Sequence, residues 1–278
     1  MTAAVKPKIR VALSGSGTKA PSHCGALAAI EDAGYEIVEL AGTSGGALCA
    51  ALYACGMKAS ALRELVMAMD WAPLMAVSPW SILSGKGYCS GNVLLKFMTT
   101  QTGGKTFADL AIDLTIMASD VSSEVPYRFD RHLTPDIPVA LAGRASASIP
   151  IVFVPVLIGG AVLMDGGLVV NLPVDLLSVD SIPRLGVELT SQCEPFKQGH
   201  HGLNKIVPHL IDLMIQSTED AHIELGKLKG AQVVQVDTSF ASPLDRKMAL
   251  ATRERLYANG YAATSAALAR MAAPAVAA

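Results

Sequence analysis

The run Gly42-Thr43-Ser44-Gly45-Gly46 combines residue types at a spacing that could support nucleophilic chemistry. Apolar residues over 37–41 favour a strand before it, and residues 47–54 favour a helix after it. At a sharp turn from strand to helix, the apical residue has a strained backbone and an outward side chain, so its neighbours must lack a Cβ. Ser44 is therefore a candidate nucleophile, although a serine in a glycine-rich loop more commonly caps a turn.

A second glycine-rich turn, Ser14-Gly15-Ser16-Gly17-Thr18-Lys19-Ala20-Pro21, follows a β-favouring run at 9–13 and opens a helix. Backbone N–H groups in such a turn can hold an anion. The same turn matches the dinucleotide fingerprint through Gly15-x-Gly17-x-x-Ala20, and Glu39 lies about twenty residues on, where that fingerprint has a ribose ligand. Oxyanion stabilisation and nucleotide binding both stay open for this turn.

A third motif, Met164-Asp165-Gly166-Gly167, ends an apolar run at 161–163. Because Gly166 and Gly167 have no side chains, another loop can approach the Asp165 carboxylate closely. An ordinary Asp-Gly turn is the alternative interpretation.

The elements that must position these motifs alternate between strand and helix, which predicts a three-layer α/β/α sandwich with a mostly parallel central sheet. Strands are expected at 9–13, 37–41, 114–118, 127–130, on both sides of Gly159-Gly160, at 185–189 and at 233–236. Helices are expected at 22–33, 47–54, 59–69, 92–100, 139–146, 204–227 and 247–271.

The 278 residues are 51% hydrophobic, and neither a linker nor an internal repeat divides them. We therefore expect a single domain over 1–278, with its core at about 8–270. The segment 70–91 is rich in Pro, Trp and Met, and it predicts either an apolar cap or an irregular loop packed on the core. The net charge of −2 gives no reason to expect nucleic-acid binding.

The five cysteines lack metal-ligand spacing, so we expect free thiols, a reducing compartment and no metal. The basic N-terminal residues are followed by too few apolar residues for a secretory signal. Prolines and glycines interrupt the longest apolar stretch, 149–164, so we expect no transmembrane helix. These features predict a cytoplasmic protein that could touch membranes peripherally.

The three motifs together resemble those of the patatin-like phospholipase family, in the same order and over most of the chain. Three segments carry the resemblance: 13–20, similar to the family's oxyanion loop; 42–46, similar to its serine elbow; and 144–150 with 165–167, similar to the segment that ends in its catalytic aspartate. The chain departs from the family at Ser16 and Ala20, where glycines are usual, and at Lys19, where arginine is usual.

The resemblance implies a lipid acyl hydrolase that cleaves carboxylic esters of phospholipid or other acyl lipids, without a cofactor. Ser44 would attack the ester, and Asp165 would take its proton through a two-residue dyad. The residues implied to support them are the oxyanion loop (Gly15, Ser16, Gly17, Thr18), the elbow and aspartate glycines (Gly42, Gly45, Gly46, Gly166, Gly167) and Lys19. Lys19 would either add positive charge to the loop or pair with a carboxylate at the surface.

An enzyme that acts on aggregated lipid needs an apolar approach surface. The segment 70–91 could supply one through Trp71, Met75, Trp80, Ile82 and Leu83.

Other functions remain to be separated from this one. A Ser-His-Asp esterase would use His200, His201, His209 or His222, but such folds place several strands before the elbow and only two fit before Ser44. A nucleotide-binding oxidoreductase would leave Ser44 and Asp165 unexplained, and a silent scaffold would use neither site. His23 is expected at a helix start and Asp120 in a turn.

Overall fold

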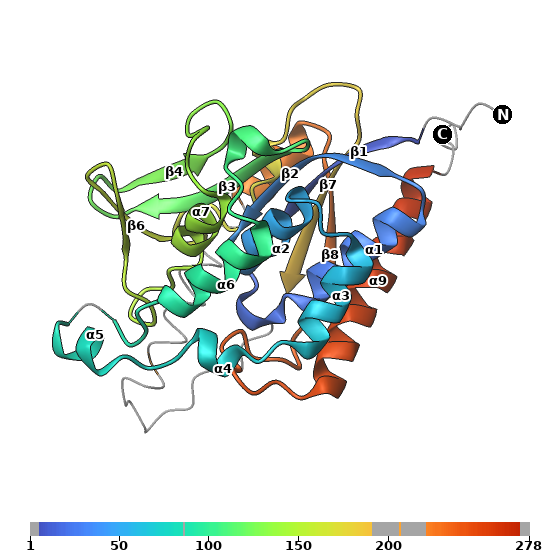
Figure 1. Cartoon of the computed structure of the whole chain (residues 1–278). Helices are drawn as coiled ribbons and strands as arrows, with labels where there is room; N and C mark the ends of the chain where they lie inside the picture. Colours follow the sequence, from blue (N-terminus) through green and yellow to red (C-terminus); the bar gives the residue numbers. More distant parts are fainter. Residues whose placement is uncertain (1–5, 86, 191–205, 207–220, 273–278) are drawn as a thin grey trace.

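The computed structural model describes residues 6–85, 87–190, 206 and 221–272 (Figure 1). Eight strands of this part of the chain form one sheet, in the order β5-β6-β3-β2-β1-β7-β8, and β4 also pairs with β3. The strands are β1 Lys8–Leu13, β2 Glu36–Thr43, β3 Asp113–Asp120, β4 Val125–Phe129, β5 Val156–Ile158, β6 Ala161–Asp165, β7 Arg184–Thr190 and β8 Gln232–Asp237.

Five neighbouring strands, from β3 through β2, β1 and β7 to β8, are parallel. The edge beyond them is antiparallel, because β3 pairs with β4 and β6 in that sense, and β5 and β6 form a hairpin around Gly159-Gly160. The predicted mostly parallel sheet is therefore confirmed, with an antiparallel edge added to it. All eight predicted strands are found within a few residues of the expected positions.

The long helices that lie wholly within the described residues are α1 Pro21–Asp32, α2 Ser44–Ala54, α3 Ala59–Ala68, α6 Asn92–Thr102, α7 Val139–Ser146 and α9 Leu250–Ala272. They agree with the predicted helices. Of the helix expected at 204–227, the structure describes residue 206 and residues from 221 onward, which are helical.

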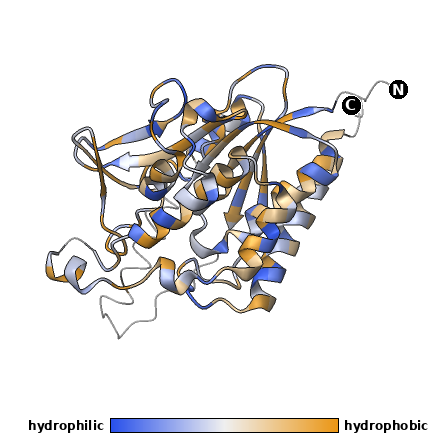
Figure 2. Ribbon diagram, viewed as in Figure 1, coloured by the Kyte–Doolittle hydropathy of each residue, from blue (hydrophilic) through white to orange (hydrophobic). Residues whose placement is uncertain are grey.

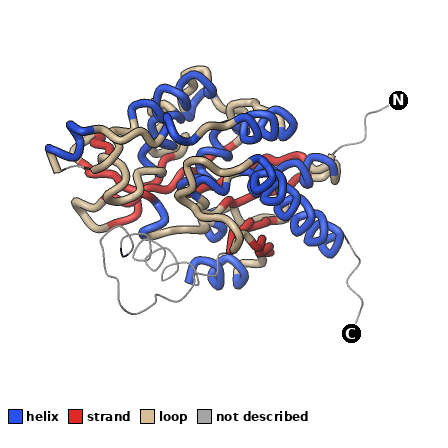
Figure 3. The backbone as a smooth tube through the Cα atoms, turned by 90° about the horizontal axis from the view of Figure 1, so that it is seen from below, coloured by secondary structure: helices blue, strands red, loops and turns tan. Residues whose placement is uncertain are grey.

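Side chains that alternate along the strands build a core on each face of the sheet. On β1, Val11 and Leu13 join the larger core, which contains residues of α1, α2, α3, α6, α7 and α9. Ala12 points the other way, into a smaller core with Leu172 and Ile223. Figure 3 shows the strands between helices on either side, and Figure 2 shows that the strands are largely hydrophobic. The three-layer α/β/α arrangement is confirmed.

The segment 70–91 divides into two parts. α4 (Trp71–Leu74) packs inward, with Trp71 and Met75 buried, whereas α5 (Pro79–Leu83) lies at the periphery in Figure 1. On α5, Trp80 is 77% exposed and Leu83 81%. The expected approach surface is therefore split, because Trp71 and Met75 do not reach the surface and Trp80, Ile82 and Leu83 do.

Within the described residues, no helix is both long and apolar enough to cross a membrane.

Candidate active site

Ser44 occupies the junction at which β2 ends and α2 begins. Its φ of 52° lies in the left-handed region, which a residue with a side chain rarely adopts. The next residue must be glycine, because a Cβ on Gly45 would lie 2.6 Å from the carbonyl oxygen of Gly17. Gly42 and Gly46 pack as tightly, against Ala47 and Ser14 respectively. The strand-turn-helix context that the sequence predicts for Ser44 is therefore present.

The hydroxyl of Ser44 donates a hydrogen bond to Oδ2 of Asp165 at 2.6 Å. Strand pairing explains how two residues so far apart in sequence meet. β4 pairs with residues 116–120 of β3, so β2 and β6 must both occupy the opposite edge of β3. Along that edge the two strands run toward each other, with Thr43 opposite Met117 and Asp165 opposite Ala118. The carboxyl ends of β2 and β6 therefore meet.

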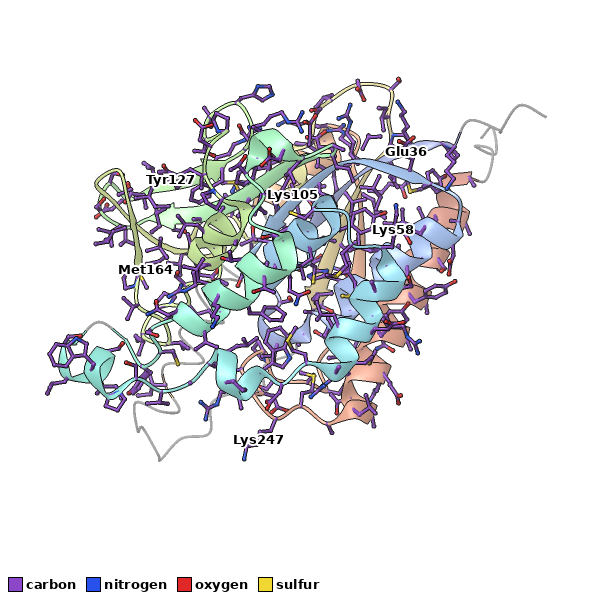
Figure 4. All side chains as sticks on the ribbon, viewed as in Figure 1. Glu36, Lys58, Lys105, Tyr127, Met164 and Lys247 are labelled. Atoms are coloured by element: carbon purple, nitrogen blue, oxygen red, sulfur yellow. The ribbon has the colours of Figure 1, made fainter. Side chains whose placement is uncertain are left out.

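Gly166 makes this meeting sterically feasible. A Cβ at that position would lie 2.2 Å from the carbonyl oxygen of Met117 and 3.0 Å from Cγ2 of Thr43. Figure 4 labels Met164, the residue before Asp165, and so locates β6 among the other side chains.

The Asp165 carboxyl is 3% exposed, and burial raises its pKa from 3.8 to about 6. Hydrogen bonds from the Ser44 hydroxyl and the Gly167 amide, the latter at 2.8 Å, oppose this rise because they favour the carboxylate. The hydroxyl of Ser119 donates to the Asp165 carbonyl at 2.8 Å and so fixes the backbone. The result is a held carboxylate whose pKa suits a general base near neutral pH.

Ser146 is a contact that the sequence analysis missed. Its hydroxyl accepts a hydrogen bond from the Ser44 amide at 2.8 Å and donates one to the Met117 carbonyl at 2.5 Å. The residue falls inside the segment 144–150 that resembles the family, but only the fold shows that α7 ends beside the elbow.

Arg144, also on α7, anchors the surrounding loops. Its buried guanidinium donates to the carbonyl oxygens of Ser90, Gly91 and Val154, and it lies over the Phe153 ring. Burial lowers its pKa to about 10. The end of the segment 70–91 is thereby tied to the loop that precedes β5.

The glycine-rich turn lies beside Ser44, and its amides differ in what they bind. The Gly15 amide donates to the backbone carbonyl oxygen and to the side-chain oxygen Oδ1 of Asn171, each at 3.1 Å. The Thr18 amide donates to the Pro243 carbonyl at 2.9 Å. We find no acceptor for the amides of Ser16 and Gly17 in the part of the chain that the structure describes. Of the four residues expected to stabilise an oxyanion, Gly15 and Thr18 thus have amides with acceptors within the protein.

Lys19 in this turn and His23 just after it are both buried. Lys19 is 3% exposed, and its ammonium donates a hydrogen bond to the Thr238 hydroxyl at 3.0 Å, so the side chain is buried rather than at the surface. Nε2 of His23 lies 2.8 Å from the Ser14 carbonyl, and because a carbonyl only accepts, Nε2 carries the proton. Burial lowers the pKa of His23 to about 4 and keeps it neutral.

Two described residues proposed for other chemistries, Glu39 and His222, have partners of their own. Glu39 forms an ion pair with Arg10 and accepts a hydrogen bond from the Ser178 amide. It lies three residues before the end of the β1–β2 pairing, so it is not placed to bind a ribose beside the glycine-rich turn. Nδ1 of His222 lies 3.1 Å from Asp175. His200, His201 and His209 lie outside the described residues.

Asp120 accepts from the hydroxyls and amide of the serines that follow it, as expected of a turn residue, and these bonds lower its pKa to about 2. Among the described residues, no group of three or more His, Cys, Asp or Glu side chains could hold a metal ion.

A cavity of about 30 Å³ opens beside Ser44. Gly17, Thr18 and Gly45 line it together with Ser44. Its apolar walls include Leu48, Trp71, Leu74, Met75, Leu94 and Phe153. A volume of this size holds one or two water molecules, so the space beside Ser44 is narrow.

Comparisons with known proteins identify the family and the fold. A family model described as patatin-like phospholipase matches residues 11–178. The uncharacterized protein YqhO of Bacillus subtilis is 29% identical over 267 residues, which cover 85% of this chain and 92% of YqhO. Rv1063c of Mycobacterium tuberculosis, an uncharacterized protein of the NTE family, is 28% identical over 167 residues, 60% of this chain. Those residues are 44% of Rv1063c, so the match spans less than half of that relative.

Among solved structures, VipD from Legionella pneumophila superimposes with a TM-score of 0.61 at 15% sequence identity, covering 96% of this chain and 67% of VipD. At this level of identity the likeness concerns the fold.

Proposed function

The chain belongs to the patatin-like phospholipase family, a family of lipid hydrolases, and on that premise we propose that it hydrolyses carboxylic esters of phospholipid or other acyl lipids through Ser44 and Asp165. The observation that carries the proposal is the 2.6 Å hydrogen bond between Ser44 and a buried carboxylate whose pKa is about 6. Neither the nucleotide-binding interpretation nor a histidine triad accounts for that contact.

In the first half of the reaction, Oγ of Ser44 bonds to the ester carbonyl carbon while its proton passes to Asp165. The π electrons of the carbonyl move to its oxygen, which becomes an oxyanion. When the carbonyl re-forms, the bond to the leaving alkoxide breaks, and Asp165 returns the proton to that oxygen. Ser44 is left as an acyl ester, and the alcohol departs.

In the second half, water replaces the alcohol. The oxygen of the water bonds to the acyl carbon while Asp165 takes a proton from that water. The second tetrahedral intermediate then breaks its bond to Oγ of Ser44, and Asp165 returns the proton to Oγ. The amides of Ser16 and Gly17 are the proposed donors to both oxyanions, and loss of one such donor typically costs about 3 to 4 kcal/mol of transition-state stabilisation.

The apolar walls beside Ser44 favour an acyl chain as the group that enters the cavity. The cavity has about 30 Å³, and we propose that α4, which contributes Trp71 and Leu74 to its wall, moves outward to admit a fatty acyl chain. α4 continues into α5, which exposes Trp80 and Leu83 to solvent. We assign to α5 contact with the surface of aggregated lipid, which would cover these side chains and bring the movable wall to the substrate.

The test is covalent labelling with a fluorophosphonate, combined with mass spectrometry of the products from a mixed lipid extract. Wild-type protein should be labelled and should release fatty acids, and Ser44→Ala should do neither. Ser60→Ala, which alters an exposed serine on α3, is the matched control and should behave as wild type. Fatty-acid release by Ser44→Ala at the wild-type rate would refute the proposal, as would saturable NAD binding by an unlabelled wild-type protein.

A further inference from the structure

The hydroxyl of Ser16 is buried and lacks a hydrogen-bond partner among the described residues. Ser16 is 5% exposed, and Oγ has neither a donor nor an acceptor within reach. The other two hydroxyls of the turn are both engaged. Ser14 Oγ accepts from the Leu189 amide at 3.0 Å, and Thr18 Oγ1 donates to the Ser242 carbonyl at 3.2 Å. Since an unsatisfied buried hydroxyl reduces stability, Ser16 invites a functional explanation.

Its location gives that explanation. A Cβ built on Gly45 would fall 2.2 Å from Oγ of Ser16 and 3.0 Å from the amide nitrogen of Gly17. The Ser16 hydroxyl and this amide therefore both lie against Gly45, the residue that follows Ser44, as does the carbonyl oxygen of Gly17, 2.6 Å from the same point. Along the same turn, a Cβ on Gly15 would lie 3.6 Å from Cβ of Ser44. Gly17, Ser44 and Gly45 also share the wall of the cavity.

We propose that the Ser16 hydroxyl donates a third hydrogen bond to the oxyanion, beside the amides of Ser16 and Gly17. The inference rests on the proposed hydrolase function and adds a catalytic side chain to it. A hydroxyl keeps its proton in this role, so no atom is transferred to or from Ser16. Ser16 is already buried before any substrate binds, and its hydroxyl gains its strongest acceptor when the carbonyl oxygen becomes an anion, which is the condition for lowering a reaction barrier.

Kinetic and stability measurements distinguish an oxyanion donor from a hydroxyl with a purely structural role. A donor to the oxyanion changes kcat and the affinity for tetrahedral adducts, whereas it leaves KM for the planar ester nearly unchanged. A purely structural hydroxyl would change the unfolding midpoint instead. A trifluoromethyl ketone is a suitable probe, because its adduct with a serine carries the negative oxygen that the hydroxyl would bind.

The experiment compares Ser16→Ala and Ser16→Cys with Ser22→Ala on a soluble short-chain ester. Ser22 is the matched control, because its hydroxyl is also buried and without a partner in the described structure but lies on α1, against α9. Ser16→Ala should lower kcat by about tenfold to a hundredfold and weaken the ketone by a similar factor, with KM unchanged. Ser16→Cys, a weaker donor of similar size, should fall between, and Ser22→Ala should match wild type.

Two outcomes overturn the inference. One is wild-type kcat in Ser16→Ala, and the other is a loss of kcat without a matching loss of ketone affinity. The proposed function is judged separately by Ser44→Ala. If Ser44→Ala is inactive while Ser16→Ala is fully active, only the third donor is refuted. If Ser44→Ala is active, the hydrolase mechanism itself is refuted.

Discussion

The backbone amide of Ser44 donates to the hydroxyl of Ser146 at 2.8 Å, so α7 holds the same residue whose side chain binds Asp165. Ser44 has a φ of 52°, a conformation that persists only where its surroundings enforce it. Ser146 supplies part of that enforcement, since it also bonds to Met117 on the neighbouring strand β3.

Removal of this hydroxyl should therefore affect both folding and catalysis. Ser146→Ala leaves the Ser44 amide buried without an acceptor, and we expect the free energy of unfolding to fall by about 1 to 3 kcal/mol. We also expect kcat to fall by about tenfold, since small displacements of a nucleophile are costly. Denaturant unfolding and steady-state kinetics measure the two effects. Ser148→Ala, whose hydroxyl contacts Arg144 instead, should lower stability with little change in kcat; equal kcat losses in both variants would contradict the positioning role.

The ionisation of Asp165 should control the pH dependence of the reaction. A general base works as the carboxylate, and burial raises the pKa of this carboxyl to about 6. We expect kcat/KM on a soluble ester to rise as pH increases through about 6 and then to level off. A profile that is flat from pH 4.5 to 8, with the fold intact throughout, would exclude Asp165 as the base.

The same burial should make the wild-type protein less stable than an inactive variant. The folded pKa lies above the ordinary 3.8, so the folded state binds more protons between 3.8 and about 6, and stability falls as pH rises through that window. The difference of roughly two pKa units corresponds to about 3 kcal/mol. Asp165→Asn carries no such penalty, and its side-chain oxygen can still accept from the Gly167 amide.

We therefore expect Asp165→Asn to be inactive, to unfold at higher denaturant concentration than wild type at pH 7.5, and to lose this advantage below pH 4. Denaturant unfolding at several pH values measures the difference. An advantage that stayed constant with pH would have a cause other than the buried charge.

The exposed side of α5 should matter for lipid surfaces alone. The double variant with Trp80→Ser and Leu83→Ser removes two exposed apolar side chains, each able to contribute about 1.5 to 3 kcal/mol when buried in a membrane interface. We expect hydrolysis of phosphatidylcholine vesicles to fall by about tenfold or more, while a soluble short-chain ester is hydrolysed as before. Leu228→Ser, at a leucine that is 84% exposed outside α5, serves as the control. Equal rates on vesicles for the double variant and wild type would remove α5 from the lipid contact.

The strands and helices could be predicted from the sequence, because short-range periodicity reports on local structure. The pairing of Ser44 with Asp165 is implied by the resemblance of three motifs to a known family, since no local pattern brings two such distant residues together. The state of each amide in the glycine-rich turn could not be predicted. Gly15 and Thr18 donate to Asn171 and Pro243, which are distant in the chain and come close only through the fold. The burial of Lys19 also depends on a distant partner, Thr238.

The division of 70–91 into a buried and an exposed half escaped prediction for a related reason. Trp71 and Trp80 are chemically identical, and composition alone does not tell which one faces the core.

β2 and β6 pair with one edge of β3 from opposite directions, and their last partners, Met117 and Ala118, are consecutive residues. The backbone pairing therefore sets the distance between the Ser44 hydroxyl and the Asp165 carboxylate. A residue inserted at that junction would push them apart by about 3.3 Å, one strand step. Additions at the Gly159-Gly160 turn would instead extend away from the junction, since that turn is at the far end of β6. This hairpin tip is accordingly the place where a tag or a foreign loop can be grafted without disturbing the chemistry.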